Sequence, residues 1–348
     1  MAQQHLEPTD PLSGHVGPVT GDALAGYLRA QATEFLRALR QHRESGGTAA
    51  GAEDPVDAAR ALRRSVRRIS ASLHTFRPLL EPDWSENLRP ELAWLSGTLG
   101  LEHAYEARLE RLLLALHRLS GAVFPSQPVE SRTAGAAPAP DRGNLTVGAA
   151  KAGALLDRQL TLARTRSHST ALQALGSSRF HAVADHIAVL ASEVPLTKTA
   201  PTTDLRPHAS AAQERLEDAV TALPLVTAGH PYNAEALIHG LSPDPSPHPQ
   251  DAPWHQVRLL LRLHRYAREV LTGGNPPLDV RLLTAGQALD RHRDASEASA
   301  AAASAARTPR IAPATAYALG VLHADQRHEV EAARFAFQQS WQKQAVST

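Results

Sequence analysis

The chain has 348 residues, and its 36 Lys and Arg against 35 Asp and Glu give a formal net charge of +1. With a total charge so close to zero, a site for a polyanion requires that charges be segregated along the chain. The absence of cysteine excludes disulfides and thiolate chemistry. No stretch reaches the roughly 20 apolar residues of a membrane span, and none has the pattern of a signal peptide. We therefore expect a cytoplasmic protein with no membrane partner.

Apolar residues recur at spacings of three and four along most of the chain, and no run has a period of two, which predicts an all-α protein. A flexible tail over 1–18 precedes a helix that starts near Asp22 and ends before Gly46. The other predicted helices cover 54–76, 82–95, 101–119, 147–175, 178–192, 209–222, 232–241, 252–272, 278–304 and 312–345.

The segment 121–146 is rich in Pro, Gly and Ala and lacks a periodic apolar face, which predicts a linker. It divides the chain into a first helical half over 19–120 and a second over 147–345. Each half contains one long basic helix that follows an acid and a proline, EDPVDAARALRRSVRR in the first and QDAPWHQVRLLLRLHRYARE in the second. This correspondence indicates an internal duplication.

The first basic helix has five arginines in nine positions and no acid between Asp57 and Glu81. The five are Arg60, Arg63, Arg64, Arg67 and Arg68. They share an arc of roughly 140°, opposite a continuous apolar face. Such an arc is most simply a solvated face, but here the guanidinium groups repel one another and no acid four residues away relieves them. We therefore consider that the compensating charge comes either from elsewhere in the chain or from a bound anion.

The second basic helix carries a narrow polar stripe on an otherwise apolar surface. The stripe consists of His255, Arg258, Arg262, Arg265 and Tyr266, within an arc of about 100°. Because the rest of this helix is predicted to be buried, the stripe should line a cleft or pair with carboxylates such as Glu269, Asp290 and Asp294. The planar five-donor fork of arginine fits either a carboxylate or a phosphate, so residue type leaves both interpretations open.

The two helices resemble the signatures of the CHAD domain, the conserved histidine α-helical domain. The first signature, V-H-x-M-R-V-x-x-R-R-L-R before F-R-P-L-L, is similar to ARALRRSVRRIS and HTFRPLL here. The second, L-H-x-V-R-K-x-x-K-R-x-R-Y-A-x-E, is similar to WHQVRLLLRLHRYARE, and smaller similarities are SSRF at 177–180 and ALDRHRDA at 288–295. The resemblance implies one domain over 19–345, with two helical-bundle halves related by pseudo-twofold symmetry around a basic cleft.

The resemblance also implies a function: non-catalytic binding of inorganic polyphosphate in a bacterial cytoplasm, in some members at polyphosphate granules, with no cofactor or metal. The residues expected to bind are Arg60, Arg63, Arg64, Arg67, Arg68, Arg179, His255, Arg258, Arg262, Arg265 and Tyr266. His255 is expected to donate to phosphate or to orient an arginine, and Tyr266 chiefly to pack. Positions that depart from the family pattern are Arg60, Ser70, Ala104, Leu259 and Leu263, which predicts a less basic cleft.

Three other functions are weighed against this one. The sequence lacks the strand-borne E-x-E-x-K motif of triphosphate hydrolases and the common nucleotide and hydrolase motifs, so we expect no enzyme. A nucleic-acid binder ranks lower because aromatic residues are not interleaved with the arginines of the first basic helix. The main alternative is a helical scaffold that has lost polyphosphate binding, in which Glu106, Glu269 or Asp294 would neutralise the arginines.

Overall fold

The computed structural model describes residues 18–45, 53–121, 140–230, 241 and 248–342, and within these ranges the predicted all-α fold is confirmed. Extended pairing there is limited to a single bridge between Leu80 and Leu196. The α-helices are α1 (Gly21–Ser45), α2 (Glu53–Thr75), α3 (Pro82–Thr98), α4 (Leu101–Ser120), α5 (Pro140–Leu175), α6 (Ser178–Ser192), α7 (Arg206–Thr221), α8 (Leu225–Ala228), α10 (Ala252–Leu271), α11 (Val280–Ala306) and α12 (Pro313–Gln342).

Most helix boundaries lie within a few residues of the predicted ones, and the main difference concerns the expected linker. Helix α5 begins at Pro140, so residues 140–146 are helical. Four predicted stretches lie outside the described residues. They are the tail up to residue 17, the linker over 122–139, the helix predicted over 232–241 up to its residue 240, and the stretch 343–345. Within the described ranges, no helix is long and apolar enough to cross a membrane.

Helix α2 shows how the sequence pattern produces the packing. Its fully buried side chains Leu62, Val66, Ile69 and Leu73 follow one another at alternating spacings of four and three, which keeps them on one face of the helix. Each such side chain contributes about 1.5–3 kcal/mol when it is fully removed from water. Helix α2 packs against α1, α3 and α10.

The largest hydrophobic core spans the expected boundary between the two halves. It joins Phe35 of α1 and Leu62 of α2 to Phe180 and Ile187 of α6, and it also includes Val270 of α10. The rings of Phe35 and Phe180 lie 6.5 Å apart. The two halves are therefore parts of one packed unit, while their twofold relationship stays a prediction.

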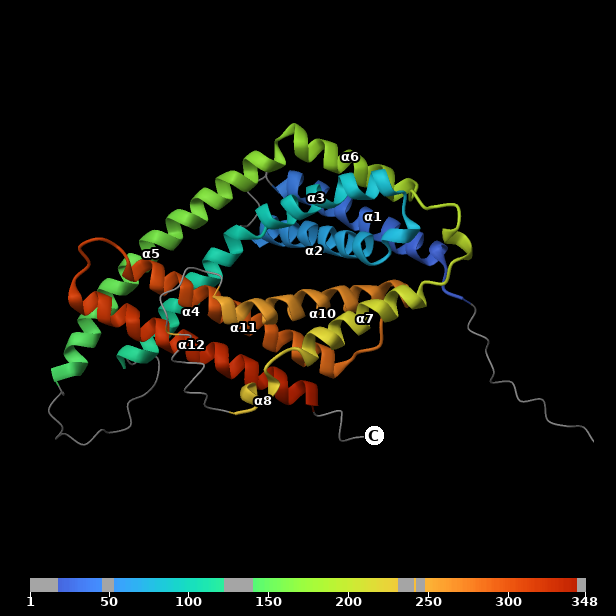
Figure 1. Ribbon diagram of the computed structural model, residues 1–348. Helices are drawn as coiled ribbons and strands as arrows, with labels where there is room; N and C mark the ends of the chain where they lie inside the picture. Colours follow the sequence, from blue (N-terminus) through green and yellow to red (C-terminus); the bar gives the residue numbers. More distant parts are fainter. Residues whose placement is uncertain (1–17, 46–52, 122–139, 231–240, 242–247, 343–348) are drawn as a thin grey trace, which may run out of the picture.

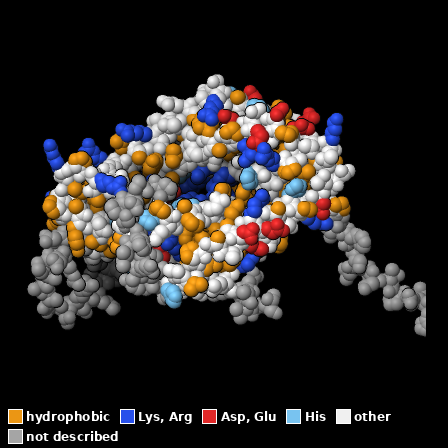
Figure 2. All heavy atoms as spheres, in the orientation of Figure 1, with side chains coloured by type: hydrophobic (Ala, Val, Ile, Leu, Met, Phe, Trp, Pro, Cys, Tyr) orange, Lys and Arg blue, Asp and Glu red, His pale blue; other side chains and the backbone are white. Residues whose placement is uncertain are grey.

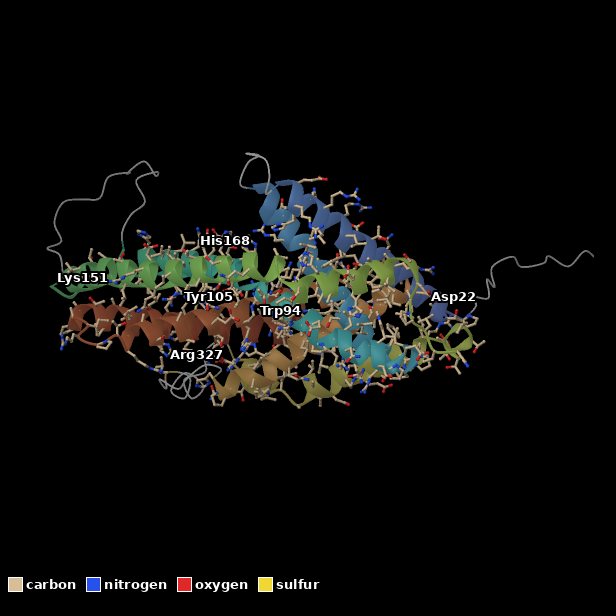
Figure 3. The ribbon with its side chains drawn as sticks, turned by 90° about the horizontal axis from the view of Figure 1, so that it is seen from above. Asp22, Trp94, Tyr105, Lys151, His168 and Arg327 are labelled. Atoms are coloured by element: carbon tan, nitrogen blue, oxygen red, sulfur yellow. The ribbon has the colours of Figure 1, made fainter. Side chains whose placement is uncertain are left out.

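The arrangement of the helices brings the two basic helices side by side (Figure 1). Helices α1, α2, α3 and α6 form the upper part of the view, and α7, α10 and α11 lie below, with α2 in contact with α10. The long helix α5 runs away from this centre to pack on α4 and α12. From above, Lys151 of α5 and Asp22 of α1 mark opposite ends of the molecule (Figure 3).

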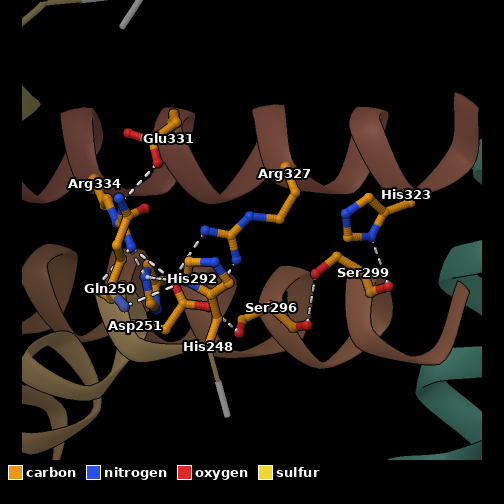
Figure 4. A network of polar contacts seen from close by, with 10 residues as sticks. All are labelled: His248, Gln250, Asp251, His292, Ser296, Ser299, His323, Arg327, Glu331 and Arg334. Atoms are coloured by element: carbon orange, nitrogen blue, oxygen red, sulfur yellow. Dashed lines mark hydrogen bonds and ion pairs between the residues drawn. The ribbon is translucent and has the colours of Figure 1, made fainter. Parts of the chain in front are cut away.

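A buried polar network fixes the start of α10 (Figure 4). Asp251, just before this helix, is fully buried and accepts hydrogen bonds from Arg327 at 2.7 and 3.2 Å and from Arg334 at 2.6 Å, both on α12. Ser296 of α11 donates a further hydrogen bond to the same carboxylate. Burying these charges costs free energy, and the hydrogen bonds that join the start of α10 to α11 and α12 offset that cost. The polar stripe of α10 is positioned by this junction.

Candidate functional site

Two neighbouring cavities lie at the two basic helices. The large chamber has a volume of about 680 Å³ and lies between α2, α3 and α10; its polar lining includes Arg67, Ser70, His74, Glu86, Arg89 and Arg262. The small chamber has a volume of about 200 Å³ and lies between α2, α10 and α11; its polar lining comprises Arg67, Arg258, Arg262, Arg265, Tyr266 and Asp290. Arg67 and Arg262 line both chambers. Figure 2 shows a hollow below α2 and above α10 and α11, with Lys or Arg side chains inside it.

Arg67 and Arg262 carry charges that no carboxylate neutralises directly. Neither guanidinium makes a hydrogen bond or an ion pair with the described part of the chain, and the Nε of Arg67 is buried without a partner. Burial, followed by repulsion from Arg258 and Arg67, lowers the pKa of Arg262 to about 10. Burial also lowers the pKa of Arg67, with Arg258 and Arg293 adding repulsion. Both groups remain cationic at neutral pH, so the cleft holds positive charge available to an anion.

Arg63 lies next to the large chamber, where its guanidinium Nε donates to the carbonyl of Ser96 at 3.1 Å. Gly100 makes room for this side chain, because a Cβ at that position would overlap the guanidinium. Burial, with repulsion from Arg67 and Arg293, lowers the pKa of Arg63 to about 10. Its positive charge therefore adds to that of the cleft.

The other α10 residues of the small chamber are held in different ways. Arg258 donates to Asp290 at 2.6 Å, whereas Arg265 is exposed and lies 4.0 Å from Glu269. Tyr266 is buried, and Arg68 and Arg265 each place a guanidinium 5.6 Å from its ring centroid. The aromatic ring thus orients two cations by cation–π contact while it packs between α2 and α10.

Arg68 differs from its neighbour Arg67 because it is paired inside the protein. Its Nε donates to Oε2 of Glu269 at 2.8 Å, and the hydroxyl of Tyr27 donates to the same oxygen at 2.9 Å. Burial and the Glu269 charge raise the pKa of Tyr27, which keeps it a hydrogen-bond donor. This group joins α1, α2 and α10, and it leaves Arg68 outside the lining of either chamber.

Three of the expected binding residues point elsewhere. Arg60 is exposed and pairs with Asp57 at 3.3 Å, and Arg64 is exposed on the same helix. Arg179 of α6 makes two hydrogen bonds to Glu91, at 2.6 and 3.1 Å, and its guanidinium lies 4.1 Å from the ring of Trp94. None of the three lines a chamber. A helical wheel places Arg60 and Arg64 near the cleft, but only packing determines where the cleft ends.

His255 is half-buried at the α11 side of the stripe. Its ring meets that of His292 edge to face, with centroids 5.4 Å apart. Burial lowers the pKa of His255. The negative charge of Asp251 acts against this shift, and the positive charge of Arg258 adds to it. The position fits a residue that orients the start of the stripe, and His255 is not among the chamber-lining residues.

Several cleft residues were not anticipated from the sequence. His74 lies two turns after Arg67 on α2, a spacing that extends the same helix face and could have been noticed. Arg89 comes from α3, where nothing in the sequence marks it, and it donates from Nη2 toward Nδ1 of His74 at 3.2 Å. Leu259, by contrast, was named as a position where the family pattern has a basic residue, and it is 45% exposed and lines the large chamber.

Of the carboxylates that could neutralise the arginines of the two basic helices, only some form ion pairs with them. Asp294 pairs with its neighbour Arg293, and Glu106 pairs with Arg164 at 3.0 Å, so neither contacts the two basic helices. Glu269 and Asp290 do pair with arginines of those helices. In the described ranges, no cluster of three or more His, Asp or Glu side chains is arranged to hold a metal ion.

Comparisons with known proteins agree with this architecture. A solved structure of PptA from Streptomyces chartreusis is similar, with 71% sequence identity over 94% of this chain and 100% of that chain, and a TM-score of 0.77. The crystal structure of the CHAD domain from the plant Ricinus communis shares the fold, with 17% identity, coverage of 96% and 93%, and a TM-score of 0.51. Curated protein sequences gave no match. The CHAD domain profile matches residues 30–281, and the chain belongs to the CHAD domain family.

Proposed function

We propose that this protein binds inorganic polyphosphate in the two chambers, without catalysing a reaction. The observation that carries the proposal is the pair Arg67 and Arg262, one from each expected half, which share both chambers and have no counter-ion among the described residues. A bound phosphate chain would supply the missing negative charge. The chain belongs to the CHAD domain family, for which polyphosphate is the expected ligand, and this membership supports the same proposal.

The chemistry of the cleft suits a linear polyanion. Guanidinium groups form charge-assisted, often bidentate hydrogen bonds to phosphate oxygens, and these bonds are stronger where water is partly excluded. Side chains one turn apart on a helix repeat about every 5.4 Å, so successive phosphates can meet successive cations without any need to read a sequence. Such binding weakens as salt rises, because displaced counter-ions provide much of its driving force.

The scaffold alternative receives support from specific ion pairs. Glu269 neutralises Arg68 and Asp290 neutralises Arg258, which is the internal pairing that a scaffold requires. It does not extend to Arg63, Arg67 or Arg262, whose guanidinium groups meet no carboxylate within 4 Å in the described ranges. We therefore favour binding over a purely structural role, and we propose that it takes place in a bacterial cytoplasm, where some members of the family bind at polyphosphate granules.

The test is a titration with long-chain polyphosphate at several salt concentrations, with single-stranded DNA of matched charge as competitor. The informative variant is Arg67→Gln/Arg262→Gln, and the matched control is Arg60→Gln/Arg179→Gln, which removes the same charge outside the chambers. We expect wild type to prefer polyphosphate, the first variant to lose at least about 30-fold in affinity, and the control to stay within about twofold. Absence of binding by wild type at low salt would favour the scaffold, and a preference for DNA would favour a nucleic-acid binder.

A further inference from the structure

The small chamber contains one carboxylate among its cations. Asp290 of α11 accepts from Nε of Arg258 at 2.6 Å, and a second guanidinium nitrogen of Arg258 lies at the same distance. The Asp290 side chain is 57% exposed, whereas that of Arg258 is 17% exposed. The carboxylate can therefore turn into water, but the guanidinium it would leave behind stays inside the chamber.

The charge of Asp290 also reaches the two arginines that both chambers share. It acts to raise the pKa of Arg67 and of Arg262, against the stronger effect of burial that lowers both. The remaining charged residues that line this chamber, Arg258 and Arg265, are cations. A single acid on α11 thus offsets part of the positive potential that α2 and α10 create in this space.

We propose that Asp290 is an internal counter-ion that occupies the phosphate-binding position on Arg258, so that polyphosphate must displace it to enter the small chamber. The inference rests on the proposed function. Carboxylate and phosphate compete for the same fork of guanidinium donors, and a displaced Asp290 would still repel the bound chain. Arg67 and Arg262, which line both chambers and are already free of ion pairs, are then the first cations of the cleft to bind the chain.

This arrangement makes engagement of the cleft depend on the number of charges in the ligand. A short anion can bind in the large chamber and leave the Asp290–Arg258 pair intact. A long chain that has passed between Arg67 and Arg262 is held next to Asp290 at a high effective concentration, and it can displace the carboxylate. Asp290 therefore acts as a specificity-determining residue: it keeps Arg258 from binding phosphate until a long polyanion displaces the carboxylate.

The experiment compares long-chain polyphosphate affinities in wild type, Asp290→Asn, Arg258→Gln, the Asp290→Asn/Arg258→Gln double variant, and Glu91→Gln. Glu91 is the matched control because it makes an equally short pair with Arg179, at 2.6 Å, outside both chambers. Circular dichroism and thermal melts verify that each variant is folded. The salt dependence of each affinity reports how many cations the ligand neutralises.

We expect Asp290→Asn to bind about fivefold tighter at low salt, with a salt slope larger by about one contact. In the Arg258→Gln background the same substitution should change affinity less than about twofold. An unchanged affinity in Asp290→Asn, or a gain of equal size with and without Arg258, would overturn the inference while leaving the proposed function intact. Failure of all five proteins to bind would remove the proposed function and this inference together.

Discussion

Arg68 and Glu269 form an ion pair of 2.8 Å that joins α2 to α10, and the adjacent Arg67 has no such partner. The two arginines are neighbours in one signature stretch, yet they have opposite roles in the structure. Glu269 is buried and also accepts from Tyr27, so the pair holds three helices together. Arg67 instead points its charge into the cleft.

Replacing Arg68 by Gln should destabilise the fold. The change leaves the buried carboxylate of Glu269 with only the more distant Arg265, at 4.0 Å, and loss of a buried pair typically costs about 3 kcal/mol or more. Urea denaturation measures the loss, and Arg64→Gln is the control because Arg64 is exposed on the same helix. We expect the control to stay within about 0.5 kcal/mol of wild type. Equal stabilities of the two variants would contradict a structural role for the Arg68–Glu269 pair.

The arginines of α2 should differ in their effect on polyphosphate binding. Arg67→Gln is expected to weaken binding about tenfold and to reduce the slope of log affinity against log salt by about 0.7–0.9, the contribution of one phosphate contact. Arg64→Gln, with the same charge change one turn away, should alter neither quantity by much, because Arg64 lies outside both chambers. Isothermal titration at four salt concentrations separates the two positions; equal slopes would show that binding follows net charge alone.

Polyphosphate binding should tighten as the pH falls, and His74 should be the main cause. In the free protein, burial and the charges of Arg89, Arg215 and Arg77 lower the pKa of His74 below its ordinary value of 6.5, so the ring is neutral at pH 7. A phosphate chain in the large chamber favours the imidazolium form, so the pKa is higher in the complex than in the free protein. Affinity therefore rises as the pH falls through the window between these two values.

The measurement is affinity for long-chain polyphosphate at pH 8 and at pH 5.5. Wild type should gain about three- to tenfold on acidification, whereas His74→Gln should gain less than about twofold. A variant at His208, which lies outside the chambers, serves as the control. If His74→Gln retains the full pH dependence, the proton is taken up elsewhere.

The buried network at the start of α10 should dominate acid sensitivity. Burial alone would raise the pKa of Asp251, but Arg327, with His292 and Ser296, holds it well below its ordinary value. A carboxyl group whose pKa is depressed in the folded state stabilises the fold above its unfolded pKa, and this contribution is lost as the pH falls through the folded pKa. Asp251→Asn should cost about 3–5 kcal/mol at pH 7, because Arg327 is left buried without a counter-ion and Arg334 keeps only its pair with Glu331.

Denaturant unfolding of Asp251→Asn and wild type from pH 7 to pH 3 tests this account. The difference between them should narrow below about pH 4, where the unfolded wild type begins to take up the proton on Asp251. Glu34→Gln provides the control, because its pair with Arg37 is exposed and contributes little. A constant difference across this range would rule out the Asp251 carboxylate as the source of the stability.

The sequence by itself determined the all-α fold and the two basic helices. Spacings of three and four between apolar residues are a local property, because one turn of helix decides which side chains share a face. The buried series from Leu62 to Leu73 and the start of α2 near Asp54 follow from that property alone. Similar local reasoning placed Arg258, Arg262 and Arg265 on one stripe of α10.

Only the tertiary structure decided which arginines are free. Arg67 and Arg68 differ by about 100° around the helix axis, and the partner that each meets depends on how α10 and α11 pack against α2. Glu269 and Asp290 lie far from α2 in sequence, so their distances to particular arginines could not be predicted from periodicity. The extent of the cleft, and with it the place of His74 and Arg89, follows from the packing of α3 beside α2 and α10, a long-range arrangement that no local spacing encodes.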